Sequence, residues 1–157
     1  MDSVDFALVA ACQAGLPLTS RPYHAIAEQV GLSADEVMMR MQAMMQAGVI
    51  RRIGLVPNHY ALGYTANGMT VWDVADEQVD ALGEAVGRLP FVSHCYRRPR
   101  RLPLWPYNLF AMVHARTIQQ AQAYAGQIAA VLGEACGQSD ILYSSRILKK
   151  TGLRIAD

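Results

Sequence analysis

The sequence contains almost no lysine and carries almost no net charge. Only Lys149 and Lys150 accompany 12 arginines among the 157 residues, and 13 acidic residues leave a formal net charge of +1. A chain this close to neutral lacks the broad positive field that holds nucleic acids or anionic membranes, so neither partner is expected. Arginine binds carboxylate or phosphate with a planar, two-pronged geometry that lysine lacks. The preference for arginine therefore indicates a specific anionic ligand.

Cysteine is also scarce. Cys12, Cys95 and Cys136 are far apart and form no C-x-x-C pair, which excludes a disulfide framework and a zinc ribbon and favours reduced thiols. No metal site is expected. The chain begins with acidic residues rather than a basic signal-peptide region, and no apolar run approaches the roughly 18 residues that cross a membrane. We expect a cytoplasmic protein whose 52% apolar residues build a core.

Several common catalytic motifs are missing. The sequence has no P-loop, no G-x-G-x-x-G, no G-x-S-x-G and no H-E-x-x-H. Its acidic residues form no paired constellation. If the protein is an enzyme, its chemistry therefore depends on histidine, tyrosine and arginine.

The first part of the chain has the pattern of three helices. Helical spacing and capping signals predict helices over residues 3–14, 23–30 and 34–47, the last beginning after the N-cap residue Ser33. The second and third helices, joined by a short turn, predict a helix-turn-helix. The β-rich run 49–56 predicts the wing of a winged helix-turn-helix.

The second part alternates strands and helices. The order strand-helix-strand-strand-helix-strand predicts a ferredoxin-like fold, in which both helices cover one face of the sheet and the other face is free for a partner or ligand. The fold class is therefore α+β, with an N-terminal domain over residues 1–60 and a second domain over residues 61–157. The expected strands cover 64–74, 91–98, 107–115 and 141–147, and the expected helices cover 77–89 and 117–136.

Arginines and aromatic residues are concentrated between Val92 and Asn108. Strand alternation places His94, Tyr96 and Arg98 on one face of a strand, with Cys95 and Arg97 on the other. A histidine, a phenol and a guanidinium side by side supply a proton donor, a hydrogen bond and an anion clamp. The alternative is a solvated basic hairpin. The remaining candidates of this segment are Arg100, Arg101, Trp105, Tyr107 and Asn108.

A second candidate cluster lies near the boundary between the two domains. Arg51 and Arg52 stand on the expected wing, and His59 and Tyr60 follow shortly after. Ligand pockets often form at domain junctions, and His59 is a candidate acid/base group or iron ligand. The alternative is a plain surface histidine. His24 and His114 are expected to be structural.

The helix over residues 34–47 is poorly suited to reading DNA. Recognition helices contact DNA chiefly with their N-terminal part, and here Asp35 and Glu36 occupy that part while Arg40 is the only basic residue. The helix also contains five methionines, at positions 38, 39, 41, 44 and 45. They predict either soft core packing or an adaptable apolar surface.

A helix-turn-helix followed by a ferredoxin-like domain resembles the Lrp/AsnC family. Within it, the sequence resembles the siroheme decarboxylase branch, and especially the small subunits that act in heme d1 biosynthesis. W-P-Y-N and S-S-R-x-L-K-K are the most specific motifs. The matching stretches are Gly48–Gly54, Asn58–Tyr64, Ser93–Pro99, Trp105–Phe110 and Ser144–Gly152.

The resemblance implies a substrate and a reaction. Siroheme is a flat iron tetrapyrrole with eight carboxylates, and no cofactor beyond this substrate is expected. A carboxy-lyase would remove two acetate carboxylates as carbon dioxide, without oxidation, to give 12,18-didecarboxysiroheme. His94 and His59 are the expected proton donors, with Tyr96 assisting, unless one histidine faces the iron. The expected substrate-binding residues are Arg51, Arg52, Arg97, Arg98, Arg100, Arg101, Trp105, Tyr107 and Asn108.

Family members commonly act as pairs of unlike homologues. The resemblance therefore implies a hetero-oligomer with homologous decarboxylase subunits, with a homodimer as the alternative. Two other functions are alternatives to the decarboxylase. One is a ligand-sensing transcription regulator, as the helix-turn-helix suggests; the other is a non-catalytic tetrapyrrole-binding partner of an active homologue.

Overall fold

The computed structural model describes residues 1–149 and residue 155, and it divides the chain into two compact units. The N-terminal unit comprises residues 1–56 together with the C-terminal end of the chain, where the Ile155 N–H donates to Gln13 Oε1 at 2.9 Å. The C-terminal unit comprises residues 57–148. Of the stretch Ser144–Gly152 that supported the family resemblance, residues 150–152 lie outside the described residues.

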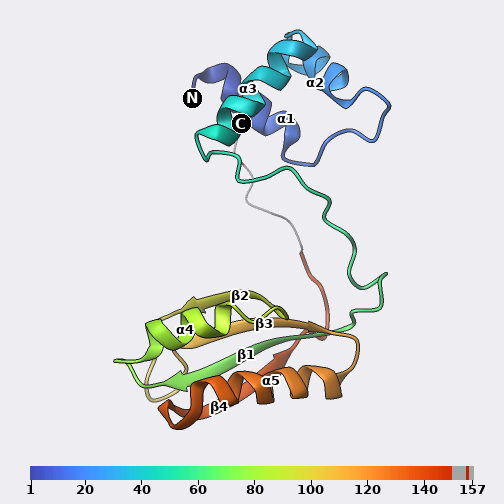
Figure 1. Cartoon of the computed structure of the whole chain (residues 1–157). Helices are drawn as coiled ribbons and strands as arrows, with labels where there is room; N and C mark the ends of the chain where they lie inside the picture. Colours follow the sequence, from blue (N-terminus) through green and yellow to red (C-terminus); the bar gives the residue numbers. More distant parts are fainter. Residues whose placement is uncertain (150–154, 156–157) are drawn as a thin grey trace. The chain divides into compact units, whose positions relative to one another are not determined.

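The N-terminal unit is built from α1 (Ser3–Cys12), α2 (Pro22–Val30) and α3 (Ala34–Gln46) (Figure 1). Asp2 and Asp5 form a reciprocal capping box at the start of α1, and the Ser33 hydroxyl accepts the Glu36 N–H at the start of α3. Leu8, Ile26, Ala27, Val37, Met41 and Met44 form the buried core. The predicted helix-turn-helix is confirmed.

The predicted wing is wrong. Residues 49–56 contain no strand, and all except Ile50 are exposed. A single β-rich segment needs a neighbouring strand for its backbone hydrogen bonds. The described residues of the N-terminal unit offer no such strand, because its other regular elements are helices. The strand preference of residues 49–56 is therefore not sufficient to predict a strand there.

The C-terminal unit is a four-stranded antiparallel sheet with two helices, and this confirms the predicted α+β, ferredoxin-like order (Figure 1). The strand order is β2-β3-β1-β4. Side chains of the sheet and both helices share one core that includes Val86, Leu109, Val113, Ile128 and Leu132. The elements are β1 (Ala66–Val74), α4 (Val79–Gly87), β2 (Val92–Arg97), β3 (Leu109–Ala115), α5 (Ile118–Leu132), the short 3-10 helix Gly133–Ala135 and β4 (Cys136–Tyr143).

The last strand begins earlier than predicted. The sequence suggested a strand over residues 141–147, but β4 covers Cys136–Tyr143. Residues 137–140 (GQSD) have low strand preference. They nevertheless belong to β4, which pairs with β1 over most of its length, including Trp72 with Ser139 and Val71 with Asp140. Tertiary pairing thus overrode local preference. Among the described helices, none is long and apolar enough to cross a membrane.

Candidate functional site

A β-bulge in β2 sets which side chains face the helices. Val92 pairs with Val113, whereas His94, instead of Ser93, pairs with Met112, so Ser93 is an extra residue in the ladder. Val92 and Cys95 both pack against the core shared with α4 and α5. Without the bulge, strict alternation over the three residue steps from Val92 to Cys95 would put these two side chains on opposite faces.

The bulge leaves three predicted site residues together on the face away from the helices. Arg97 pairs with Asp80 of α4 at 2.9 Å, so His94, Tyr96 and Arg98 alternate onto the opposite face, as predicted. On β3, the residues between the core positions Leu109, Ala111, Val113 and Ala115 face the same way. We call this surface the helix-free face; its residues on these two strands are His94, Tyr96, Arg98, Phe110, Met112 and His114.

One end of the helix-free face combines arginine with aromatic rings. The Arg98 guanidinium lies 5.3 Å from the centre of the Tyr96 ring and 5.4 Å from that of Phe110, within the range of cation–π attraction. Trp105 stacks on Phe110 with ring centres 6.4 Å apart and lies edge-on to Tyr107 at 5.1 Å. Paired backbone hydrogen bonds of 2.8 Å between Arg101 and Trp105 fix this turn. Tyr96, Arg98, Trp105 and Tyr107 therefore share one surface.

The other end of the helix-free face contains histidines. Ser93 Oγ lies 3.0 Å from His94 Nδ1 and 3.0 Å from His114 Nε2. His114 Nδ1 lies 2.6 Å from Oδ1 of the buried Asn67. The ring of His59 has its centre 5.0 Å from that of His114. Two candidates predicted from the sequence, His94 and His59, thus lie close to a third histidine, His114, for which the sequence predicts a structural role.

Two of the predicted substrate-binding residues have internal partners instead. Arg100 binds Asp73 at 2.7 Å, pairs with Asp76, and donates to the Val74 carbonyl at 2.6 Å. The buried Asn108 accepts the Val74 N–H at 2.9 Å and donates to the Val74 carbonyl at 2.8 Å. These contacts give both residues a role in holding the end of β1 to the arginine-rich segment. We therefore do not assign carboxylate binding to Arg100, Asn108 or Arg97, which pairs with Asp80.

We expect an Arg100→Met substitution to destabilise the protein at neutral pH but to have much less effect below about pH 3, where free carboxyls are protonated. The hydrogen bond from Arg100 is the main cause that lowers the pKa of the Asp76 carboxyl. A carboxyl with a lowered folded-state pKa stabilises the fold above its unfolded pKa, and this contribution is lost as the pH falls through the folded value. Urea midpoints of both proteins at several pH values from 7 to 2.5 measure this. A difference that does not change with pH would contradict the expectation.

The remaining arginine candidates are less constrained. Among the described residues, neither Arg98 nor Arg101 has a carboxylate partner within ion-pair distance. Arg51 and Arg52 are exposed and belong to the N-terminal unit, whereas His59 belongs to the C-terminal unit. The joint action of these three residues therefore stays a prediction.

The only basic side chain of α3 is occupied by internal ion pairs. Arg40 binds Asp2 at 2.8 Å, Asp5 at 2.9 Å and Glu36 at 2.7 Å, and these hydrogen bonds raise the pKa of Arg40. Met41 and Met44 are buried, while Met38, Met39 and Met45 are exposed. The surface of α3 is therefore apolar and acidic, which is unfavourable for contact with DNA phosphates.

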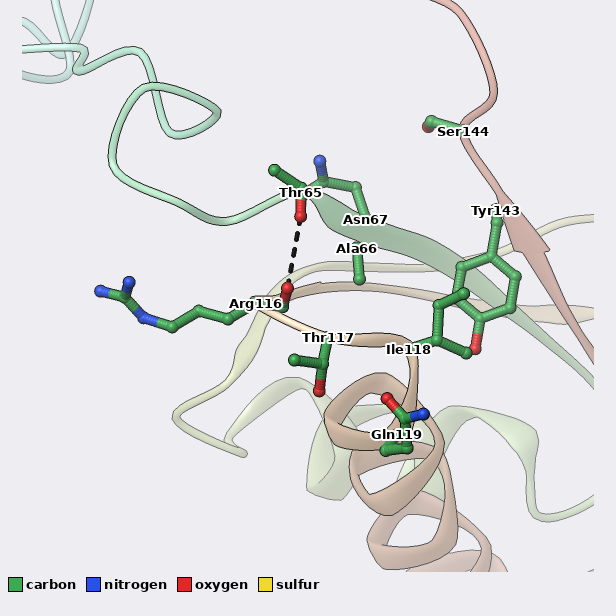
Figure 2. Close-up of a pocket in the computed structure, with 9 residues that line it drawn as sticks. All are labelled: Thr65, Ala66, Asn67, Arg116, Thr117, Ile118, Gln119, Tyr143 and Ser144. Atoms are coloured by element: carbon green, nitrogen blue, oxygen red, sulfur yellow. Dashed lines mark hydrogen bonds between the residues drawn. The ribbon is translucent and has the colours of Figure 1, made fainter.

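Two cavities border the histidine end of the sheet. One, of about 440 Å³, is lined by Ser93 and His114 together with Tyr64, Pro90, Phe91, Val92 and Tyr124. The other, of about 390 Å³, lies where β1, the start of α5 and the end of β4 meet; Asn67 and Tyr143 line it (Figure 2). There, the Thr65 hydroxyl donates to the Arg116 carbonyl at 3.3 Å, and the Arg116 side chain extends away from the other lining residues (Figure 2).

The described residues contain neither a metal-binding group nor a cysteine suited to act as a nucleophile. They contain no group of three histidine, cysteine or acidic side chains arranged to hold a metal ion. Cys12, Cys95 and Cys136 form no disulfide. Burial raises the pKa of the Cys95 thiol, which disfavours the nucleophilic thiolate. Histidine, tyrosine and arginine therefore remain the reactive groups of this site.

Both parts of the chain match known protein families. Residues 61–149 match the family described as the AsnC-like ligand binding domain, and residues 5–51 match the siroheme decarboxylase NirDL-like HTH domain. The siroheme decarboxylase NirH subunit of Paracoccus pantotrophus is 55% identical over 156 residues, which cover 99% of this chain and 97% of the relative. The NirH subunit of Pseudomonas aeruginosa is 58% identical over 149 residues, or 95% of this chain and 87% of the relative.

A solved structure is similar over the full length of the chain. It is that of the siroheme decarboxylase NirDL in co-complex with an iron-uroporphyrin III analogue, with a TM-score of 0.65 and 30% sequence identity. The match covers 99% of this chain but only 47% of the NirDL chain. The present chain thus corresponds to about half of that protein.

Proposed function

The chain belongs to the family of siroheme decarboxylase subunits, and on this premise we propose that its helix-free face binds siroheme and carries out the decarboxylation. The observation that supports this most is the combination on one surface of His94, several aromatic rings and Arg98, which has no carboxylate partner among the described residues. A flat macrocycle ringed by carboxylates needs an apolar support and cationic contacts at its rim. Trp105 and Tyr107 suit the macrocycle, and Arg98 and Arg101 suit its carboxylates.

The reaction requires a proton for each carboxylate lost. An acetate side chain breaks its bond to the carboxyl carbon, leaves carbon dioxide, and becomes a methyl group by taking up one proton. Protonation of the pyrrole system favours the loss of carbon dioxide, because the electron pair of the broken bond then enters a cationic ring. His94, exposed on the helix-free face, is the proposed donor. Tyr96, with its ring centre 6.2 Å from that of His94, is proposed to assist.

His59 is the second proposed acid. It is half-buried and lies beside His114, so it belongs to the same group of imidazoles as His94. The arginines are proposed to hold the carboxylates that do not react, which keeps the reacting acetate in register with the donor. We propose no cofactor beyond the iron-containing substrate.

We further propose that the chain works with a homologous subunit in the cytoplasm. It spans about half of the NirDL chain, which is itself named a siroheme decarboxylase. A second, unlike subunit would correspond to the other half of the NirDL chain. On this basis the assembly is a carboxy-lyase, and its product is 12,18-didecarboxysiroheme.

The proposed function is tested by product mass. The purified protein is incubated with siroheme without oxygen, both alone and with a homologous subunit, and the tetrapyrrole is analysed by mass spectrometry. Loss of the mass of two carbon dioxide molecules per siroheme supports the proposal. An unchanged mass in every mixture, despite siroheme binding, would instead identify a non-catalytic binding subunit.

A transcription regulator is the second candidate, because α2 and α3 form a helix-turn-helix. The ion pairs of Arg40 and the acidic start of α3 argue against it. Retention of promoter DNA in a gel, weakened by added salt, together with an unchanged siroheme mass would favour the regulator.

A further inference from the structure

We propose that Ser93 and His114 form a proton relay with His94, and that the relay connects the helix-free face with the cavity that Ser93 and His114 line together with Phe91 and Tyr124. The proposal rests on the function proposed above, in which His94 gives its proton to the substrate. Ser93 and His114 are positioning and proton-transfer residues, since they act through His94 rather than on the substrate itself.

The hydrogen bonds define the proton positions along the relay. Asn67 uses its amide nitrogen to donate to the Tyr64 carbonyl at 3.3 Å, so its Oδ1 is the acceptor for His114 Nδ1–H at 2.6 Å. In the proposed arrangement, a neutral His114 accepts the Ser93 hydroxyl hydrogen at Nε2, in place of the more distant Met112 carbonyl at 3.4 Å, and Ser93 Oγ accepts from His94 Nδ1–H. This arrangement leaves His94 Nε2 pointing away from the relay and able to exchange a proton with a bound substrate.

The relay also permits a charge to be held away from the substrate. When His114 is the cation, its Nε2–H donates to Ser93 Oγ, the Ser93 hydroxyl donates to His94 Nδ1, and His94 carries its proton at Nε2. As the substrate takes the Nε2 proton, the Ser93 proton moves to His94 Nδ1 and the His114 proton moves to Ser93. The substrate gains one proton, His114 loses one, and both histidines end neutral in the arrangement described above.

The cavity provides a route for proton supply that the substrate does not cover. Ser93 and His114 both line it. Phe91 and Tyr124, which stack with ring centres 4.3 Å apart, also line it and pack against the core on the helix side. A macrocycle on the helix-free face would exclude water from His94, whereas water in this cavity still reaches Ser93 and His114.

The groups around the relay determine its response to pH. His59, with its ring centre 5.0 Å away, and Tyr64 and Tyr124 face the His114 side. Ser93 and Tyr96 adjoin His94, and Arg98 lies beyond Tyr96. Of the described residues that line the cavity, none has a carboxylate. Two imidazoles joined through one hydroxyl are coupled, because the proton position on one ring sets the direction of the hydrogen bond at the other.

The tautomers are measured first, on the chain without substrate, by the nitrogen chemical shifts of the imidazole rings. We expect neutral His94 to carry its proton at Nδ1, and we expect the titrations of His94 and His114 to depend on each other. Ser93→Ala should abolish both signatures, whereas Ser93→Thr, which keeps the hydroxyl, should restore them. An unchanged His94 tautomer and titration in Ser93→Ala would overturn the proposal.

Kinetics with the partner subunit provide the second test. Ser93→Ala should lower kcat by about 10- to 100-fold with little change in KM, since loss of ring orientation affects the chemical step. His114→Gln keeps a hydrogen-bond acceptor but removes the stored proton, so the basic limb of its pH–rate profile should move to lower pH. Ser139→Ala on β4, outside the relay, is the matched control and should have the wild-type profile. Unchanged profiles for both relay variants would exclude the relay.

The two sets of measurements separate the two proposals. If the wild-type protein and its partner remove no carbon dioxide from siroheme, the decarboxylase function fails, while the nitrogen shifts still decide whether the relay exists. If decarboxylation proceeds but Ser93→Ala has wild-type shifts and rates, the relay alone fails.

Discussion

Replacement of His94 by glutamine should lower the decarboxylation rate of the assembled enzyme by about 100- to 10,000-fold, the usual contribution of a general acid. Glutamine has a similar length and still forms hydrogen bonds, but it cannot deliver a proton near neutral pH. The effect should appear in kcat rather than in KM, because the aromatic rings and Arg98 that are proposed to hold the macrocycle are unchanged. Steady-state measurement of product mass against time at several siroheme concentrations, with the partner subunit in excess, gives kcat and KM separately.

The matched control is His24→Gln. His24 is an exposed residue of α2 in the N-terminal unit, so its replacement should leave the rate within about twofold of wild type, as is usual for surface changes. A parallel His59→Gln variant distinguishes the two proposed acids. Wild-type activity in His94→Gln together with a large loss in His59→Gln would transfer the donor role to His59.

Asn108→Leu should reduce the free energy of unfolding by about 2–4 kcal/mol, since a buried donor that loses its partner costs about 1–3 kcal/mol and further hydrogen bonds disappear with it. Asn108 is 2% exposed and binds both the N–H and the carbonyl of Val74. Leucine fills a similar volume but satisfies neither group. The Val74 carbonyl keeps its bond from Arg100, so the N–H of Val74 is the group left without an acceptor.

Urea unfolding of the wild type and the variant measures this difference, with Asn58→Leu as the control. Asn58 is exposed, and its side chain accepts one backbone N–H, that of Tyr60, at 3.2 Å, so its replacement should cost less than about 1 kcal/mol. Equal stability of Asn108→Leu and wild type, accompanied by weaker siroheme binding, would return Asn108 to the substrate-binding set.

Much of the fold was predictable because its local signals agree with its tertiary structure. Ser33 caps a helix, Gly31 ends one in a left-handed conformation, and the apolar stripe of α5 faces the core. The family inferred from the W-P-Y-N and S-S-R-x-L-K-K motifs is confirmed by the relatives. The predicted placement of His94, Tyr96 and Arg98 on one face is also confirmed, because it depends on strand alternation alone.

The rest depends on contacts between segments far apart in the sequence. His114 lies 20 residues after His94, and only the register of β2 on β3 brings both rings to one serine hydroxyl. Likewise, the four arginines between residues 97 and 101 look equivalent in sequence. Asp80 on α4 and Asp73 on β1 distinguish them, since these carboxylates bind Arg97 and Arg100. A pattern of residue types does not contain this information.

The extra residue in β2 separates what Ser93 contributes from the alternation of the strand. Three residue steps join Val92 to Cys95, yet they span only two positions of the ladder, and for this reason both side chains face the core. Deletion of Ser93 would therefore remove the bulge and leave a regular strand in which His94, Tyr96 and Arg98 keep their face. What such a deletion removes is the hydroxyl between His94 and His114. The serine of the proposed relay thus occupies an insertion that the sheet itself does not require.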